Sequence, residues 1–227
     1  MLKVVGYTPK IGMAGTVTIK LNKNIEDYLF HKQGFLDRDF CKSTLETLSE
    51  SQWERHDFTG YETNDPEHGF GWTREVKSSP SGSAEPEFLG HTGPGWGEEQ
   101  AKINNVIVRK LQSTLTDYVR SFQYKWFDGW NGYSVIKFLR YNEGHQMAEH
   151  CDHISSLFDG KVKGIPMLSI VGQINEDFDG GEFVMWGEKV IEFKSGDLIV
   201  FPSNFMYPHR VQPVTKGARY SYVSWAY

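Results

Sequence analysis

Cysteine and long apolar runs are both scarce in this sequence of 227 residues. Only two cysteines occur, Cys41 and Cys151, so no disulfide framework is expected. No stretch approaches the roughly 18 apolar residues of a membrane span, and the first residues lack the apolar core of a secretory signal. We therefore expect a cytoplasmic protein with no membrane partner.

An excess of positive charge is missing as well. The formal net charge is -5 and the sequence pI about 5.9, whereas proteins that bind nucleic acids usually carry a concentrated basic surface. We expect no nucleic-acid partner. The length predicts one domain that spans residues 1–227.

Two segments in the first half of the chain have apolar residues at helical spacing. Glu98–Phe122 places them along one stripe, with acidic residues at the favourable N-terminal end. Arg38–Leu48 predicts a shorter helix with Asp37 as its N-cap. Residues 1–24 are consistent with an edge strand or an ordered arm. We interpret residues 1–132 as helical support together with a substrate loop.

That loop is the segment Asp57–Gly97, which has little periodicity. A loop this long inside a compact domain is normally either functional or disordered. The two interpretations are a flexible insertion and a lid that orders over a bound substrate. In the second, the contacts would come from Trp72, Arg74, Phe88 and Trp96.

The period changes from helical to strand-like after Gly132. Short alternating segments separated by glycine-containing turns, in which Gly180, Gly181 and Gly196 supply positive φ angles, predict a jelly roll. The expected strands are Tyr133–Tyr141, Ile165–Ile174, Glu182–Trp186, Lys189–Phe193, Leu198–Phe201, Tyr207–Val211 and Tyr220–Ala226. The fold class is therefore α+β and mainly β, with a double-stranded β-helix (jelly-roll) core over residues 133–227 and supporting N-terminal helices.

The main chemical pattern is His150-Cys151-Asp152 together with His209. In an extended segment, side chains alternate between faces, so His150 and Asp152 would converge while Cys151 points away. Two histidines and one carboxylate form the facial triad of non-haem Fe(II) oxygenases, which leaves positions open for a co-substrate and O2. A closed zinc site is disfavoured, because the chain has no C-x-x-C pair to complete it. His-x-Asp alone is usually accidental, so the metal site depends on the residues that follow.

Arg219 follows His209 by ten residues, with Gly217 in the turn between their segments. We expect these segments to be neighbouring antiparallel strands, about 4.8 Å apart. The guanidinium would then lie one small dicarboxylate away from a metal held by His209. This suits 2-oxoglutarate, whose keto-acid end would chelate iron while Arg219 binds the far carboxylate in a bidentate fork. Without the triad, a surface ion pair would be the ordinary role of Arg219.

From Tyr133 to Tyr227, the order and spacing of these motifs resemble the 2-oxoglutarate/Fe(II)-dependent dioxygenases of the prolyl 4-hydroxylase type. The motifs are Leu139-Arg-Tyr141-Asn-Glu-Gly144, His150-x-Asp152, Gly180-Gly181-Glu182, Gly196-Asp-Leu-Ile-Val-Phe201-Pro-Ser203 and the run from His209 to Trp225. The resemblance implies an enzyme that uses Fe(II), 2-oxoglutarate and O2, with ascorbate as an optional further cofactor. It would hydroxylate an aliphatic carbon, a peptidyl proline of a peptide or protein above all, and release succinate and CO2.

The resemblance also implies roles for residues around the co-substrate. Tyr141 would be a second donor to the distal carboxylate, with a satisfied core tyrosine as the alternative. Ser169 takes the place of a small hydroxyl residue beside the co-substrate, and Ser221 lies on the same face as Arg219. Trp225 would close the pocket on the substrate side or pack as an ordinary buried aromatic.

One departure and three alternatives bear on the substrate. Collagen-type prolyl 4-hydroxylases usually carry Lys where this chain has Arg219, which weakens the case for proline and leaves co-substrate binding intact. A hydroxylase of another amino acid or small molecule is the first alternative. A nucleic-acid demethylase is the second, although that family typically has a further Arg where this chain has Trp225. The third is a non-catalytic jelly-roll binding protein, which would not need the triad together with Arg219.

Overall fold

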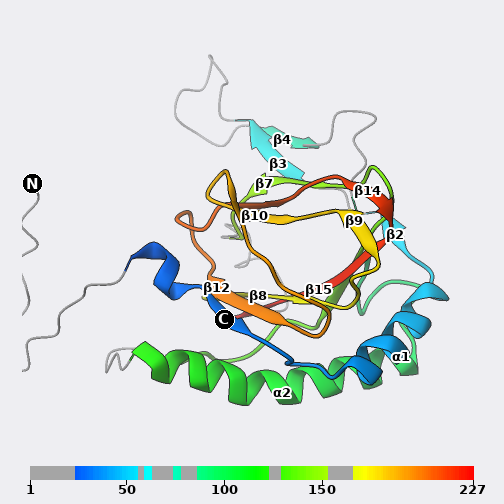
Figure 1. Cartoon of the computed structure of the whole chain (residues 1–227), viewed down its shortest axis with the longest axis horizontal. Helices are drawn as coiled ribbons and strands as arrows, with labels where there is room; N and C mark the ends of the chain where they lie inside the picture. The colour runs from blue at the N-terminus through cyan, green and yellow to red at the C-terminus, as the bar shows by residue number, and fades with distance from the viewer. Residues whose placement is uncertain (1–23, 56–58, 63–73, 78–85, 123–128, 153–165) are drawn as a thin grey trace, which may run out of the picture.

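The computed structural model describes residues 24–55, 59–62, 74–77, 86–122, 129–152 and 166–227. Antiparallel strands form two facing sheets, and two helices pack along the outside of the larger sheet (Figure 1). These features confirm the mainly β fold class with a jelly-roll core and supporting helices. The arm expected at residues 1–24 lies almost entirely outside the described residues. Within them, no helix is long and apolar enough to cross a membrane.

Both predicted helices are confirmed. Helix α1 spans Arg38–Ser49, and the Asp37 carboxylate caps it by accepting the Phe40 backbone N–H at 2.8 Å. Helix α2 spans Glu98–Phe122, the bounds that its apolar stripe predicts. A short 3-10 helix, η1 (Ile25–Tyr28), precedes strand β1. The helices therefore form where apolar periodicity and capping agree.

Seven strands form the larger sheet. Their order is β1 (Phe30–Lys32), β12 (Leu198–Pro202), β8 (Leu168–Gln173), β15 (Arg219–Ala226), β6 (Lys137–Tyr141), β5 (Glu87–Leu89) and β2 (Glu54–Arg55). The smaller sheet has the order β11 (Lys189–Val190), β10 (Phe183–Met185), β13 (His209–Val211) and β7 (Met147–His150). Two further pairs are β14 (Val214–Gly217) with β9 (Phe178–Gly180), and β3 (Thr59–Glu62) with β4 (Arg74–Lys77).

Alternation along the central strands divides the interior into two cores. On β12, Leu198 and Val200 pack toward the helices, whereas Ile199 and Phe201 face the smaller sheet. Strand β8 behaves in the same way, and all six of its residues are buried. Because helices cover one face and a second sheet the other, both strands are buried on both faces, and β12 reads as a continuous apolar run in the sequence.

The second half of the chain contains more strands than its sequence predicts. The seven expected strands correspond to β6, β8, β10, β11, β12, β13 and β15, most of them shorter than expected. Strands β7, β9 and β14 were not predicted, because three or four residues hold too little alternation to stand out. The positive φ angles expected at Gly180, Gly181 and Gly196 are confirmed at 75°, 67° and 85°.

The segment Asp57–Gly97 is more regular than predicted. It contributes the β3–β4 pair, and its strand β5 lies between β6 and β2 in the larger sheet. Trp96 packs against Phe138 on the helix side, with ring centroids 6.2 Å apart, and is thereby a core residue. Phe88 packs into the core between the sheets. Trp72 lies outside the described residues, Arg74 begins β4, and the lid interpretation stays a prediction.

Candidate metal and co-substrate site

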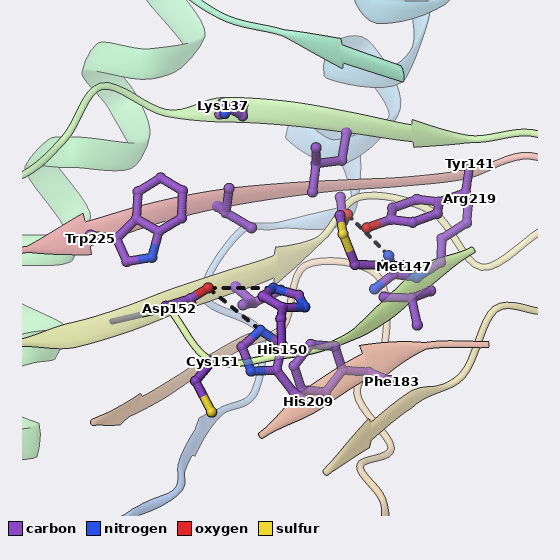
Figure 2. Close-up of a pocket in the computed structure, with 15 residues that line it drawn as sticks. Lys137, Tyr141, Met147, His150, Cys151, Asp152, Phe183, His209, Arg219 and Trp225 are labelled. Carbon is purple, nitrogen blue, oxygen red and sulfur yellow. Dashed lines mark hydrogen bonds and ion pairs between the residues drawn. The ribbon is translucent and has the colours of Figure 1, made fainter. Parts of the chain in front are cut away.

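The two histidines of the predicted triad lie opposite one another on paired strands. Strands β7 and β13 are antiparallel with His150 opposite His209, and the ring centroids are 4.3 Å apart. Asp152 follows the end of β7, and its Oδ1 lies 3.5 Å from His150 Nε2 and 3.7 Å from His209 Nε2 (Figure 2). One ligand atom from each residue lies within 4.8 Å of the others. The structure therefore brings the three side chains together, although the strand expected to carry Asp152 ends at His150.

Backbone carbonyls fix the orientation of both rings. The Nδ1 atom of His150 lies 2.8 Å from the Ala148 carbonyl oxygen, and that of His209 lies 3.1 Å from the Tyr207 carbonyl oxygen. A carbonyl oxygen only accepts, so in each contact Nδ1 carries the proton and donates. A neutral ring then has its Nε2 lone pair directed toward Asp152. This is the outer hydrogen bond that metal-binding histidines almost always make.

Electrostatics favour the protonation states that a metal requires. Burial lowers the pKa of His209 to about 4, with the nearby Asp152 charge acting in the opposite direction. Burial would raise the pKa of Asp152, but the neighbouring His150 and His209 rings outweigh it and hold that pKa well below its usual range. Near neutral pH, the His209 ring is therefore uncharged and the carboxylate is ionised. Metal ligands have to be in these states before they can bind.

Aromatic contacts hold His209 in place from two sides. The Phe183 ring stacks on it at a centroid distance of 5.3 Å and an interplanar angle of 24°. The Phe201 ring meets it edge-on at 5.1 Å and 70°. Phe183 lies on β10 and Phe201 on β12, so both sheets restrict rotation of the imidazole.

A cavity of about 190 Å³ extends from the triad between the two sheets. Its wall on the larger sheet comes from β6 and β15, which pair antiparallel with Arg219 opposite Tyr141 and Val223 opposite Lys137. Alternate residues of both strands therefore face the cavity. The lining residues are Lys137, Leu139, Tyr141, Met147, His150, Cys151, Asp152, Val171, Phe183, His209, Val211, Arg219, Ser221, Val223 and Trp225.

Arg219 is fully buried at the far end of this cavity. Its Nη1 donates to the Ser221 hydroxyl at 3.1 Å, and the guanidinium carbon lies 5.1 Å from the centroid of the Tyr141 ring. Burial lowers the pKa of Arg219, and its Nη2 is buried without a hydrogen-bond partner in the described part of the chain. A buried guanidinium with an unused N–H lacks an anion. The carboxylate of a dicarboxylic acid would supply that anion, so the residues present fit 2-oxoglutarate.

The expectation that the segments of His209 and Arg219 are neighbouring strands is wrong. Strand β13 belongs to the smaller sheet and β15 to the larger one. Between them, β14 pairs with β9 and carries the chain from one sheet to the other. The two side chains therefore face each other across the space between the sheets, typically about 10 Å, instead of across one hydrogen-bonded pair. A small dicarboxylate fits between them in either geometry.

The family model of the 2OG-Fe(II) oxygenase superfamily matches residues 136–227, which contain the triad, Arg219 and the cavity. The same part of the chain is similar to a PKHD-type hydroxylase of Idiomarina loihiensis, 35% identical over 89 residues that cover 38% of each chain. It is also similar to one of Janthinobacterium sp. (strain Marseille), 34% identical over 39% of this chain and 41% of that protein. The chain spans about two fifths of these curated relatives, since the matches cover 38% and 41% of them.

Solved structures resemble the chain over most of its length. A prolyl-4-hydroxylase of Pseudomonas putida aligns with a TM-score of 0.53 and 18% identity, over 88% of this chain and 91% of that one. A prolyl hydroxylase of Trichoplax adhaerens, in complex with a hypoxia inducible factor peptide fragment, aligns with a TM-score of 0.57 and 15% identity, over 88% and 84%. At these identities, the likeness shows the shared fold and confirms the jelly-roll core.

Ser169 was expected beside the co-substrate, and Lys137 was not expected in the cavity lining. The Ser169 hydroxyl lies 2.6 Å from that of Ser203, acts to lower the pKa of Asp152, and is not among the residues that line the cavity. Lys137, which does line it, was missed. The sequence held the signal, because Lys137 shares one strand face with Leu139 and Tyr141 at period two. Trp225 lines the cavity as the substrate-side interpretation requires.

Proposed function

We propose that the chain is a 2-oxoglutarate- and Fe(II)-dependent dioxygenase that hydroxylates an aliphatic carbon, with a peptidyl proline as the target. The observation that carries this proposal is one cavity with a triad on one wall and, opposite, a buried Arg219 that lacks an anion. The products besides the hydroxylated substrate are succinate and CO2. Ascorbate serves as an optional further cofactor.

Each residue of the site has a distinct role in this proposal. His150 and His209 bind Fe(II) through Nε2, and Asp152 binds it through its carboxylate. When bound, the iron activates O2 and 2-oxoglutarate at the positions that the triad leaves open. Arg219 binds the distal carboxylate, while Ser221 orients the guanidinium through the 3.1 Å hydrogen bond.

Neighbouring residues shape and dry the site. Tyr141 lies beside the guanidinium and would contribute its hydroxyl to the same carboxylate. Leu139 and Val171 present apolar surface between the two ends of the cavity and exclude water from the reacting groups. Ser169 lies beside Asp152, which supports a role in orienting this metal ligand. This role replaces the contact with the co-substrate that was expected for Ser169.

Relatives support the peptide substrate. The similar curated proteins are PKHD-type hydroxylases, and the neighbours among solved structures are prolyl hydroxylases, one of them with a peptide fragment bound. A peptide or protein substrate and O2 are accordingly the partners that we propose. The acidic net charge of -5 agrees with the absence of a nucleic-acid substrate.

A succinate-release screen tests this function. The Fe(II)-loaded chain is incubated with 2-oxoglutarate in air, with proline-containing peptides and free amino acids added one at a time. We expect one class to increase succinate release and to gain the mass of one oxygen atom. Asp152→Ala should abolish both signals, while Glu149→Ala, on the same strand end but outside the cavity lining, should retain them. Succinate release that Asp152→Ala leaves intact would refute the proposal.

A further inference from the structure

The cavity contains a second cation, at the end away from Arg219. On the paired strands β6 and β15, Tyr141 lies opposite Arg219 and Lys137 lies opposite Val223. Lys137 lies four positions before Tyr141, and four positions along a strand span roughly 13 Å. Figure 2 shows Lys137 and Trp225 at one end of the cavity, with Arg219 and Tyr141 at the other. A 2-oxoglutarate molecule that spans Arg219 and the metal leaves Lys137 to another ligand.

None of the described carboxylates near Lys137 would remain available as its counter-ion once a metal is bound. Its Nζ lies 5.1 Å from the centroid of the Phe88 ring, and it forms no salt bridge with any of the residues that the structure describes. Its neighbours along the cavity wall, Leu139 and Val223, are apolar. Asp152 is the one carboxylate among the described residues that line the cavity, and a bound metal would share its charge. Lys137 is half-buried, so its ammonium can still accept an anionic ligand from the cavity.

Trp225 adds an unused donor at the same end. It lies two residues beyond Val223 on β15 and faces the cavity. Its indole Nε1 is buried and has no hydrogen-bond partner among the residues that the structure describes. A buried indole N–H usually finds an acceptor. Lys137 and Trp225 thus bring an ammonium and an indole N–H, both donors to a carboxylate, to the same end of the cavity.

Charge balance leads to the same kind of ligand. The iron, Arg219 and Lys137 are positive, and Asp152 is the single negative side chain in the cavity lining. Binding of the 2-oxoglutarate dianion still leaves a surplus of one positive charge in a cavity whose lining residues are buried or half-buried. Bound cations are often the largest charges in such a site, so this surplus favours an anionic substrate group.

We propose that Lys137 and Trp225 form a carboxylate subsite, which selects substrates that carry a carboxylate near the carbon to be hydroxylated. This inference rests on the proposed function, because it concerns the substrate of the same site. Two sources share the required chemistry. One is the α-carboxylate of a free amino acid or chain end, and the other is an acidic side chain within a peptide.

Binding to a complex that does not turn over tests the subsite. The chain is loaded with Mn(II) and the unreactive co-substrate analogue N-oxalylglycine, and matched probes are titrated by calorimetry. One pair is L-proline and L-prolinamide, and the other is a proline peptide with glutamate or glutamine beside the proline. We expect the carboxylate member of one pair to bind on the order of 10- to 100-fold more tightly, as for charge-assisted hydrogen bonds. The pair that shows the preference identifies the source.

Variants assign the preference to its residues. Lys137→Met should abolish the difference within the pair, Lys137→Arg should preserve most of it, and Trp225→Phe should reduce it. Lys102→Met, an exposed lysine on α2, is the matched control and should behave like the wild type. Equal or absent binding of both members, or a preference that survives Lys137→Met, would overturn the subsite. Failure of the proposed function is distinguishable, since the Fe(II)-loaded wild type would then release no succinate from 2-oxoglutarate in any assay.

Discussion

Replacing Arg219 with methionine should weaken co-substrate binding and leave the stability of the ligand-free protein nearly unchanged. The guanidinium is buried and its Nη2 lacks a partner, so the ligand-free protein gains little from its charge. An apolar side chain of similar length is often neutral or stabilising where a buried ion is removed together with its cost of desolvation. We therefore expect Arg219→Met to fold with nearly wild-type stability in the absence of 2-oxoglutarate.

Affinity for the co-substrate should fall steeply in the same variant. Loss of a buried charged contact costs about 2–5 kcal/mol, which corresponds to roughly a 30- to 5000-fold weaker Kd. Arg219→Lys keeps the charge without the planar fork and should retain part of the affinity. Calorimetric titration of 2-oxoglutarate into the Mn(II)-loaded chain measures both effects. Arg109→Met, an exposed arginine on α2, is the control and should not alter the titration.

Thermal unfolding provides an independent measurement. A ligand at 100 times its Kd stabilises the folded state by about 2.7 kcal/mol, and the wild type should show this gain with 2-oxoglutarate. Arg219→Met at the same concentration should gain at most about 0.9 kcal/mol, because a Kd weakened 30-fold or more leaves the ligand at about 3 times its Kd or below. A variant that binds 2-oxoglutarate as tightly as the wild type would refute the assignment of Arg219. A variant that unfolds without ligand would refute the claim that the guanidinium contributes little to folding.

Two further predictions concern the scaffold. Gly181 has a φ of 67°, and a Cβ there would lie 3.1 Å from Arg219 Cδ. Gly181→Ala should therefore strain the turn and weaken 2-oxoglutarate binding in the same titration. An unchanged affinity for 2-oxoglutarate would contradict this. Burial alone would raise the pKa of Asp197. Hydrogen bonds from the backbone N–H groups of Lys194 and Gly34 and from the His31 ring outweigh burial, so the pKa of Asp197 is lowered overall. Its stabilisation is therefore present above the unfolded value of about 3.9 and lost as the pH falls through the folded value. Asp197→Asn should lower the free energy of unfolding by about 1–3 kcal/mol at pH 7. Urea titrations should show the difference between the wild type and Asp197→Asn shrinking toward pH 3. A difference that stays constant with pH would contradict this.

The parts of the fold that the sequence predicted correctly depend on local interactions. Helix α2 was recognised because its apolar residues keep a helical spacing along Glu98–Phe122. Helix α1 was recognised because Asp37 caps it. The triad could be proposed because two histidines and an aspartate are the ligand types that ferrous iron uses. Such signals lie within a few residues or in the chemistry of side chains.

The parts that were missed depend on how distant segments pair. Strand β7 is too short to show alternation, yet its register opposite β13 brings His150 to His209. Nothing local indicates that β14 pairs with β9 and thereby places Arg219 on the opposite sheet. Lys137 was overlooked because its importance comes from the cavity that it faces. Strand order across a sandwich is a tertiary property, and a single sequence does not contain it in readable form.

Anaerobic titration of Fe(II) and 2-oxoglutarate into the chain tests the central claim most directly. A 2-oxo acid chelated to ferrous iron gives a visible charge-transfer absorption, which requires that the metal and the co-substrate occupy one site. The wild type should develop this absorption with one equivalent of iron per chain, and Asp152→Ala and His209→Ala should not. Its absence in the wild type, or its persistence in both variants, would contradict the assignment of His150, Asp152 and His209 as the iron site.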